Sequence, residues 1–263
     1  MNFLIYLLII FVSFIATYII KGLIDKFLKE EELYEEYEKE HEVELCQKLS
    51  KEQKRIHKDA IKKLKVNFKP KFDWLVFILL AICECLLFYF KGVSTDFFVY
   101  SFLVCILIIS FFTDLKMSII PNETNYLSAV VGFIYAVSTL IYNKVRLGSY
   151  DKGLDLILGG VVAFALFFAI SGVSYLILKK EGMGGGDIKL VAGIGFFMGL
   201  KNFIQIFVLS FLIAAIVSIF LLILKKKGKS DYIPFGPFLC IGAYITMIVP
   251  FMTTAMIWLR LLY

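Results

Sequence analysis

Two aspartates lie at the ends of long apolar runs in this sequence, where a carboxyl group is costly to place and therefore points to a function. Asp114 follows the run FLVCILIISFFT, and Asp187 precedes the run IKLVAGIGFFMGL. Two carboxyl groups held together at a partly dry site share a single proton near neutral pH. One group can then act as general base on a water molecule while the other protonates the carbonyl oxygen under attack, which is the chemistry of peptide-bond hydrolysis. The alternative is that each aspartate only caps a helix at the membrane surface, with Asp187 as an N-cap.

Glycines surround the second aspartate. Gly184, Gly185 and Gly186 precede Asp187 directly, and Gly182 stands two residues before them. A backbone without side chains adopts positive φ angles easily and lets another backbone come close. We therefore expect an extended substrate to pass beside Asp187. A glycine-rich connection without a role in catalysis is the alternative.

The elements that must position these aspartates are predicted to be membrane-spanning helices. Hydrophobic residues make up 60% of the 263 residues, whereas soluble domains are roughly half apolar. Runs long enough to cross a hydrocarbon core about 30 Å thick lie near residues 3–20, 74–90, 97–113, 125–142, 154–178, 203–224 and 238–259. A shorter run, 188–200, would be an eighth span. The sequence thus predicts an all-α polytopic membrane protein with about eight transmembrane helices and a charged cytoplasmic arm between the first two.

The distribution of basic residues predicts the orientation of these spans, because short connections rich in Lys and Arg stay in the cytoplasm. With the N-terminus outside, most of the 28 basic residues face inward, in segments 21–73, 114–124, 179–189 and 225–235. The C-terminus then also lies outside. Two spans separate Asp114 from Asp187, so both are predicted at the cytoplasmic face. The net charge of +6 follows from this bias and requires no nucleic-acid partner.

The charged arm is predicted to fold as a helical hairpin. Its segment 30–44 is acidic and its segment 48–71 is basic, so two helices folded together would neutralise each other. Ser50 to Gln53 has the form of a capping box that would start the second helix. The alternative is that the acidic helix attracts a basic partner peptide. The predicted organisation is a first transmembrane helix at 1–21, the hairpin at 22–73 and a membrane-embedded core at 74–263.

No metal site is expected in the arm or in the membrane. His41, Cys46 and His57 match no common zinc-binding spacing. The remaining cysteines lie inside apolar spans, where cysteine is more often a small hydrophobic residue than a redox group.

Three motifs resemble those of the type IV prepilin peptidase family. In GMGGGDIKL, Gly184-Gly185-Gly186-Asp187 is similar to the GxGD signature of that family. Asp114 followed by Ile120-Pro121-Asn122 resembles the segment of its first aspartate, and IPFGPFL at 233–239 resembles the motif that leads into its last helix. The motifs occur in the order of the family and cover about residues 100–260.

The resemblance implies a membrane aspartic endopeptidase of the bacterial cytoplasmic membrane. Such an enzyme removes the short basic leader from type IV prepilins or pseudopilins, after a glycine and at the cytoplasmic face. Its partners would be that substrate and the lipid bilayer, and proteolysis would need no cofactor and no metal. The implied site residues are the catalytic Asp114 and Asp187, the active-site backbone of Gly184, Gly185 and Gly186, and the substrate-binding residues Pro121, Asn122, Lys189, Pro234, Phe235 and Gly236.

The first cytoplasmic segment departs from the pattern of the family. Many bacterial members carry two C-x-x-C pairs there, taken to bind zinc, and also N-methylate the new terminus. This chain has only Cys46 in that segment. The sequence therefore favours proteolysis without methylation, and S-adenosylmethionine would be a cofactor only if methylation is retained.

Three rival functions make different demands on the sequence. An ion- or proton-coupled transporter would place acids near the middle of the bilayer and show internal repeats. A presenilin-type intramembrane protease would carry a Pro-Ala-Leu motif late in the chain, where this sequence reads PFGPFL. A non-catalytic assembly protein would tolerate substitution of Asp187.

Overall fold

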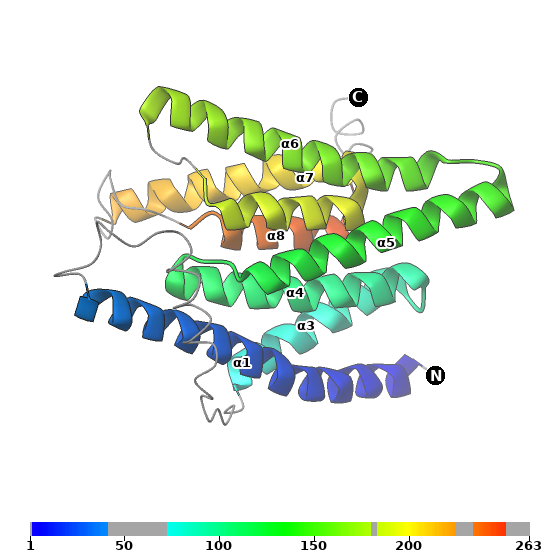
Figure 1. Ribbon diagram of the computed structural model, residues 1–263. Helices are drawn as coiled ribbons and strands as arrows, with labels where there is room; N and C mark the ends of the chain where they lie inside the picture. Colours follow the sequence, from blue (N-terminus) through cyan, green and yellow to red (C-terminus); the bar gives the residue numbers. More distant parts are fainter. Residues whose placement is uncertain (1, 42–72, 180–182, 225–233, 251–263) are drawn as a thin grey trace.

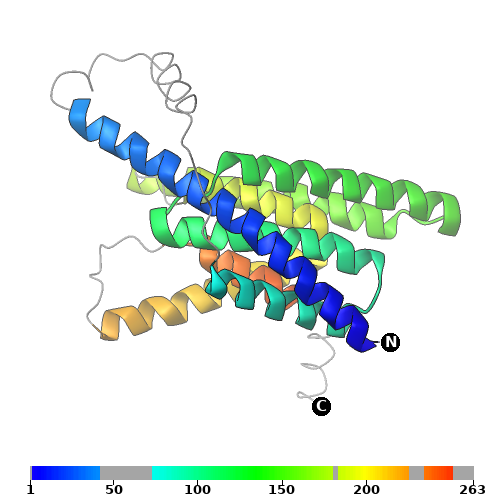
Figure 2. The same ribbon diagram turned by 90° about the horizontal axis from the view of Figure 1, so that it is seen from below.

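The predicted all-α architecture is confirmed. A computed structural model describes residues 2–41, 73–179, 183–224 and 234–250, and the regular elements in these ranges are all helices (Figures 1 and 2). They are α1 (Asn2–His41), α3 (Trp74–Lys91), α4 (Thr95–Met117), α5 (Asn122–Leu147), α6 (Asp151–Leu178), α7 (Gly185–Ile223) and α8 (Gly236–Ile248). Within the described ranges, six helices are long and apolar enough to cross a membrane, and α8 is a shorter apolar helix.

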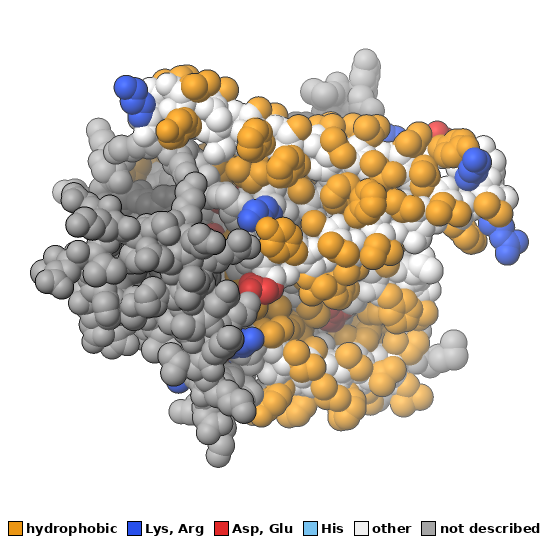
Figure 3. All heavy atoms as spheres, in the orientation of Figure 1, with side chains coloured by type: hydrophobic (Ala, Val, Ile, Leu, Met, Phe, Trp, Pro, Cys, Tyr) orange, Lys and Arg blue, Asp and Glu red, His pale blue; other side chains and the backbone are white. Residues whose placement is uncertain are grey.

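Apolar side chains cover the helices as lipid contact requires. Figure 3 shows hydrophobic side chains over the middle of the visible face, with Lys and Arg side chains mostly toward the helix ends. Large side chains such as Phe11, Phe98, Phe133 and Phe168 are more than 45% exposed. Exposed apolar surface of this extent is unfavourable in water. The chain is therefore a multi-pass membrane protein.

Helix α7 consists of two arms joined at Gly199. Its 39 residues are helical except Gly199, which has φ 81° and ψ 168°. The second arm returns toward the end of the bundle where the first arm begins (Figure 1). The two arms correspond to the apolar runs 188–200 and 203–224. With α7 counted as two arms, the described helices account for the eight predicted segments.

Glycines allow the reversal of α7 and its close contact with α6. A residue other than glycine is strained at the φ and ψ of Gly199. A Cβ atom on Gly159 of α6 would lie 2.5 Å from the carbonyl carbon of Gly199 and 2.6 Å from the carbonyl oxygen of Gly195. The small-xxx-small pair Gly195 and Gly199 therefore lets two backbones touch.

Helix α1 continues without a break from the first apolar run into the charged arm. No proline interrupts residues 2–41, and the helix passes through the expected boundary between residues 21 and 22. The rest of the arm, including the predicted second helix from Ser50 and the residues Cys46 and His57, lies outside the described residues. The hairpin itself therefore stays a prediction.

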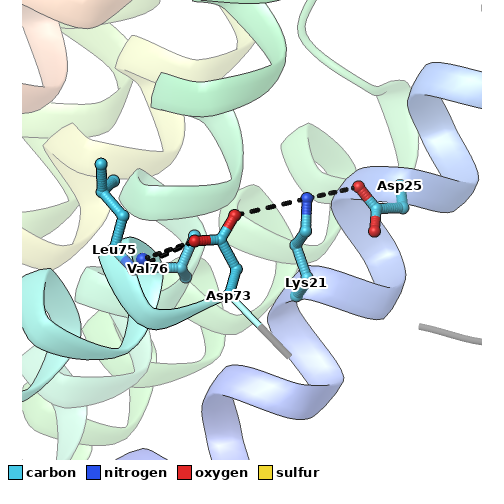
Figure 4. Close-up of polar contacts among 5 residues, drawn as sticks. All are labelled: Lys21, Asp25, Asp73, Leu75 and Val76. Atoms are coloured by element: carbon cyan, nitrogen blue, oxygen red, sulfur yellow. Dashed lines mark hydrogen bonds and ion pairs between the residues drawn. The ribbon is translucent and has the colours of Figure 1, made fainter. Parts of the chain in front are cut away.

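An ion-pair network connects the beginning and the end of the arm (Figure 4). Lys21 Nζ of α1 lies 2.6 Å from Asp25 Oδ1 and 3.5 Å from Asp73 Oδ2. Asp73 also caps α3, because its carboxylate accepts hydrogen bonds from the backbone N–H groups of Leu75 and Val76. Both ends of the arm are thus held together at the edge of the helical bundle.

Replacing Gly199 by alanine should destabilise the protein by about 1–3 kcal/mol from backbone strain. The added methyl group would also contact the Asp155 carboxyl group. Gly172→Ala is the matched control, because no atom lies within 4 Å of a Cβ at that helical position. Thermal unfolding in detergent should show a lower midpoint for Gly199→Ala and an equal or higher midpoint for Gly172→Ala. Equal midpoints for Gly199→Ala and wild type would contradict the assigned strain.

Candidate active site

Two helix termini position the two aspartates at the same end of the bundle. Asp114 lies in the last turn of α4, where its carbonyl oxygen accepts a hydrogen bond from Ser118, the left-handed C-cap with φ 53°. Asp187 lies in the first turn of α7. Their exposed fractions are only 3% and 4%. Helices α5 and α6 lie between them in sequence, and this even number of crossings returns the chain to the same side.

The N-cap alternative for Asp187 is wrong. The N-cap residue of α7 is Gly184, whose carbonyl oxygen accepts a hydrogen bond of 3.1 Å from the Asp187 N–H group. No side chain forms a cap hydrogen bond at this helix end. The Asp187 carboxyl group is thus buried and does not cap its own helix.

Both carboxyl groups converge on Gly236, the first residue of α8. A Cβ atom on Gly236 would lie 2.5 Å from Asp114 Oδ2 and 3.1 Å from Asp187 Oδ1. The distance between these two oxygen atoms therefore cannot exceed the sum of those lengths. Neither oxygen has a hydrogen-bond partner among the described residues. Two buried carboxyl groups this close repel each other when both are ionised, and a shared proton removes the repulsion.

The three glycines before Asp187 do not use positive φ angles. In the described part of the chain, positive φ occurs at Gly92, Gly148 and Gly199 but not at Gly184, Gly185 or Gly186. The expectation that these glycines are needed for positive φ angles is therefore wrong. A Cβ on Gly186 would lie 3.2 Å from Ile120 Cβ, so this glycine permits close packing against the segment before α5. No atom lies within 4 Å of a Cβ on Gly185, which leaves room beside Asp187.

Of the six residues implied to bind substrate, only Gly236 is shown to approach the carboxyl groups directly. Pro121 is the N-cap residue of α5. Lys189 Nζ donates a hydrogen bond of 2.8 Å to Asn122 Oδ1 and lies 5.3 Å from the centre of the Tyr126 ring. The hydrogen bond between Lys189 and Asn122 joins the beginnings of α5 and α7. The partner of the Lys189 ammonium group is therefore the Asn122 side-chain amide.

The segment before α8 contacts aromatic rings of other helices. Pro234 and Phe235 precede α8 directly. The ring centre of Phe235 lies 4.9 Å from that of Phe211 in α7 and 6.1 Å from that of Phe167 in α6. These contacts fix the position from which α8, and hence Gly236, begins.

Two buried polar residues near the ends of α4 and α5 were not identified from the sequence. Ser110 is fully buried one turn before Asp114, and Asn125 is fully buried one turn after Pro121. The Ser110 hydroxyl and both polar atoms of the Asn125 amide have no hydrogen-bond partner among the described residues. For Ser110, the sequence did contain one indication. Ser110 precedes Asp114 by four residues, and this spacing puts both side chains on one face of a helix.

The described residues contain no group of three or more His, Cys, Asp or Glu side chains that could hold a metal ion. His41, Cys46 and His57 lie in the arm, and the structure describes none of their side chains. The absence of a cofactor from proteolysis stays a prediction.

Comparison with known proteins supports the motif resemblance. Residues 101–219 match the model of the type IV leader peptidase family. Three similar proteins are each called prepilin leader peptidase/N-methyltransferase. That of Aeromonas salmonicida (strain A449) is 29% identical over 146 residues, which are 56% of this chain and 47% of that protein. That of Pseudomonas aeruginosa is 31% identical over 134 residues, 51% of this chain and 46% of that protein.

The protein of Bacillus subtilis (strain 168) is 30% identical over 154 residues, which are 59% of this chain and 56% of that protein. The chain thus spans about half the length of the curated relatives it matches. No solved structure matches the chain significantly. The resemblance to the prepilin peptidases is confirmed by the family model, and the matched stretch contains Asp114 and Asp187.

Gly236→Ala should abolish or strongly reduce cleavage while the protein still folds. The new methyl group would lie 2.5 Å from Asp114 Oδ2 and 3.1 Å from Asp187 Oδ1, so it would push the two carboxyl groups out of their present positions. Peptide cleavage and thermal unfolding should be measured on the same preparation, with Gly172→Ala as the control for a methyl group added to a helix. Full cleavage by Gly236→Ala would show that the two carboxyl groups do not act at this position.

Proposed function

We propose that this chain is a membrane aspartic endopeptidase of the type IV leader peptidase family that removes the basic leader of a type IV prepilin or pseudopilin. The observation that carries the proposal is the convergence of two buried carboxyl groups, Asp114 and Asp187, on Gly236. The names of the similar proteins support the substrate class.

The proposed reaction uses the carboxyl pair as base and acid. The charged carboxylate takes a proton from water as the water oxygen bonds to the carbonyl carbon, and the protonated partner gives its proton to the carbonyl oxygen. The former base, which now holds the proton taken from water, gives it to the amine nitrogen as the carbon–nitrogen bond breaks. A hydroxyl group of the tetrahedral intermediate returns a proton to the former acid. The two roles belong to the pair as one unit, because a single proton is shared between Asp114 and Asp187.

We infer that the site faces the cytoplasm of a bacterial cell, with both termini of the chain outside. The basic residues Lys116, Lys179 and Lys189 lie at the end of the bundle that holds the two aspartates, and α1 carries its charged extension toward the same end. Five basic residues, Lys91, Lys144, Arg146, Lys152 and Lys201, lie at the other ends of the described helices. The orientation therefore rests on the whole sequence, in which 22 of the 28 basic residues belong to segments 21–73, 114–124, 179–189 and 225–235. A leader with positive charge would meet the site from that side.

The geometry favours a protease over a transporter. Asp114 and Asp187 lie in the terminal turns of their helices, whereas ion-coupling acids lie near the middle of the bilayer. Glu84 of α3 is a buried acid within a span, which is the position that a transporter would use. Its Oε2 accepts a hydrogen bond of 2.6 Å from Ser101 of α4, so this acid has a partner in the packing of the two helices. A presenilin-type protease stays the alternative within enzymes, and cleavage within an apolar segment would indicate it.

Asp114→Asn and Asp187→Asn should each stop leader removal almost as completely as the double variant. Each substitution removes one member of a single catalytic unit, so the losses should not add. Cleavage of a co-expressed prepilin should be compared at equal membrane abundance of the three variants. Substantial cleavage by either single variant at normal stability would exclude the carboxyl pair as the catalytic group.

The mature prepilin is expected to carry no added methyl group from this protein. The first cytoplasmic segment lacks the paired cysteines of many methylating relatives, although the similar proteins are named as methyltransferases too. The N-terminal mass of prepilin matured in cells with and without this protein measures both activities at once. An additional methyl mass that depends on this protein would refute the expectation.

A further inference from the structure

Ser110 lies on the same face of α4 as Asp114. Residues four apart on a helix have Cβ atoms about 5–6 Å apart, and a helical side chain leans toward the N-terminus of its helix. The Asp114 carboxyl group therefore leans toward the turn that contains Ser110. Ser110 is fully buried, and its hydroxyl has no hydrogen-bond partner among the described residues.

Five other hydroxyl side chains of the described helices behave differently. They donate to a carbonyl oxygen three or four residues earlier on the same helix, at Thr17, Thr113, Ser128, Ser218 and Thr246. This local bond satisfies a hydroxyl in a membrane without a partner from another helix. Ser110 does not form it, so its hydroxyl remains available to another group.

Five buried polar atoms at this end of the bundle share this condition. They are Ser110 Oγ, Asp114 Oδ2, Asp187 Oδ1 and the two polar atoms of the Asn125 amide. A buried polar atom without a partner is costly, and a buried water molecule typically makes about three hydrogen bonds to such atoms. Building on the proposed function, we propose that Ser110 is a positioning residue that holds the hydrolytic water together with the two carboxyl groups.

The geometry explains why a water molecule makes this connection. No direct hydrogen bond joins the Ser110 hydroxyl to Asp114, so a water molecule is the group that can connect the two. The hydroxyl fixes the direction of the water lone pair that attacks the peptide carbonyl. Ser110 itself is neither consumed nor bonded to the peptide, so its loss should slow the reaction without weakening substrate binding.

Ser210 provides a matched control. It is also fully buried, and its hydroxyl also lacks a partner among the described residues. It lies on the second arm of α7, in close contact with Gly242 of α8. If an unpaired hydroxyl matters only for packing, Ser110→Ala and Ser210→Ala should behave alike.

The test compares Ser110→Ala, Ser110→Thr and Ser210→Ala in the full chain. The probe is a synthetic peptide with a basic leader, a glycine at the cut and an apolar segment after it. Ser110→Ala should lower kcat about ten-fold, the effect of one lost hydrogen bond, and leave KM unchanged. Its unfolding temperature should be equal to or higher than that of wild type, because an unpaired buried hydroxyl has been removed. Ser110→Thr should restore kcat, and Ser210→Ala should not change it.

Several results would overturn the role of Ser110. These are an unchanged kcat for Ser110→Ala, a loss of kcat that tracks a lower unfolding temperature, and equal losses for Ser110→Ala and Ser210→Ala. A well-folded Ser110→Thr variant without activity would also contradict it. The variant Asp187→Asn distinguishes a failure of this proposal from a failure of the proposed function. If Asp187→Asn is inactive and Ser110→Ala has normal activity, the carboxyl pair remains the catalytic group and only the role of Ser110 is refuted.

Discussion

Two carboxyl groups can remain side by side in a dry interior only when they share a proton and when no other side chain separates them. In this protein the second condition is met at Gly236, where the hydrogen atom in place of a side chain leaves space for both Asp114 and Asp187. The first condition makes the pair suitable for hydrolysis, because one group can accept a proton while the other donates one. The site therefore depends on three helix ends meeting at one glycine.

The path of α7 brings these three ends together. A straight helix of 39 residues would be about 58 Å long, and α8 would then begin far from Asp187. The reversal at Gly199 returns the second arm to the end of the bundle from which α7 began, and α8 follows from there (Figure 1). α8 packs against both α4 and α7. The close contact of Gly159 with Gly195 and Gly199 supports the reversal from the side of α6.

Much of this arrangement could be predicted from the sequence, since apolar runs fix the helices and an even number of crossings puts Asp114 and Asp187 at one end. The sequence did not reveal that both carboxyl groups would converge on Gly236 at the start of α8, because a motif gives residue types but not the distance between helices. The reversal at Gly199 was indicated only by a short apolar run. Ser110 was missed because serine in a membrane helix usually bonds to its own backbone.

Asp114 and Asp187 are expected to bind the transition state of peptide hydrolysis as one unit. The most direct measurement is the affinity for a leader peptide in which a hydroxyethylene group replaces the cleaved peptide bond, compared with a peptide of the same sequence. Wild type should bind the analogue at least about 100-fold more tightly than the peptide, and either asparagine variant should lose this advantage while keeping its affinity for the peptide. Equal affinity of wild type for both ligands, or an advantage that persists in both asparagine variants, would contradict the account.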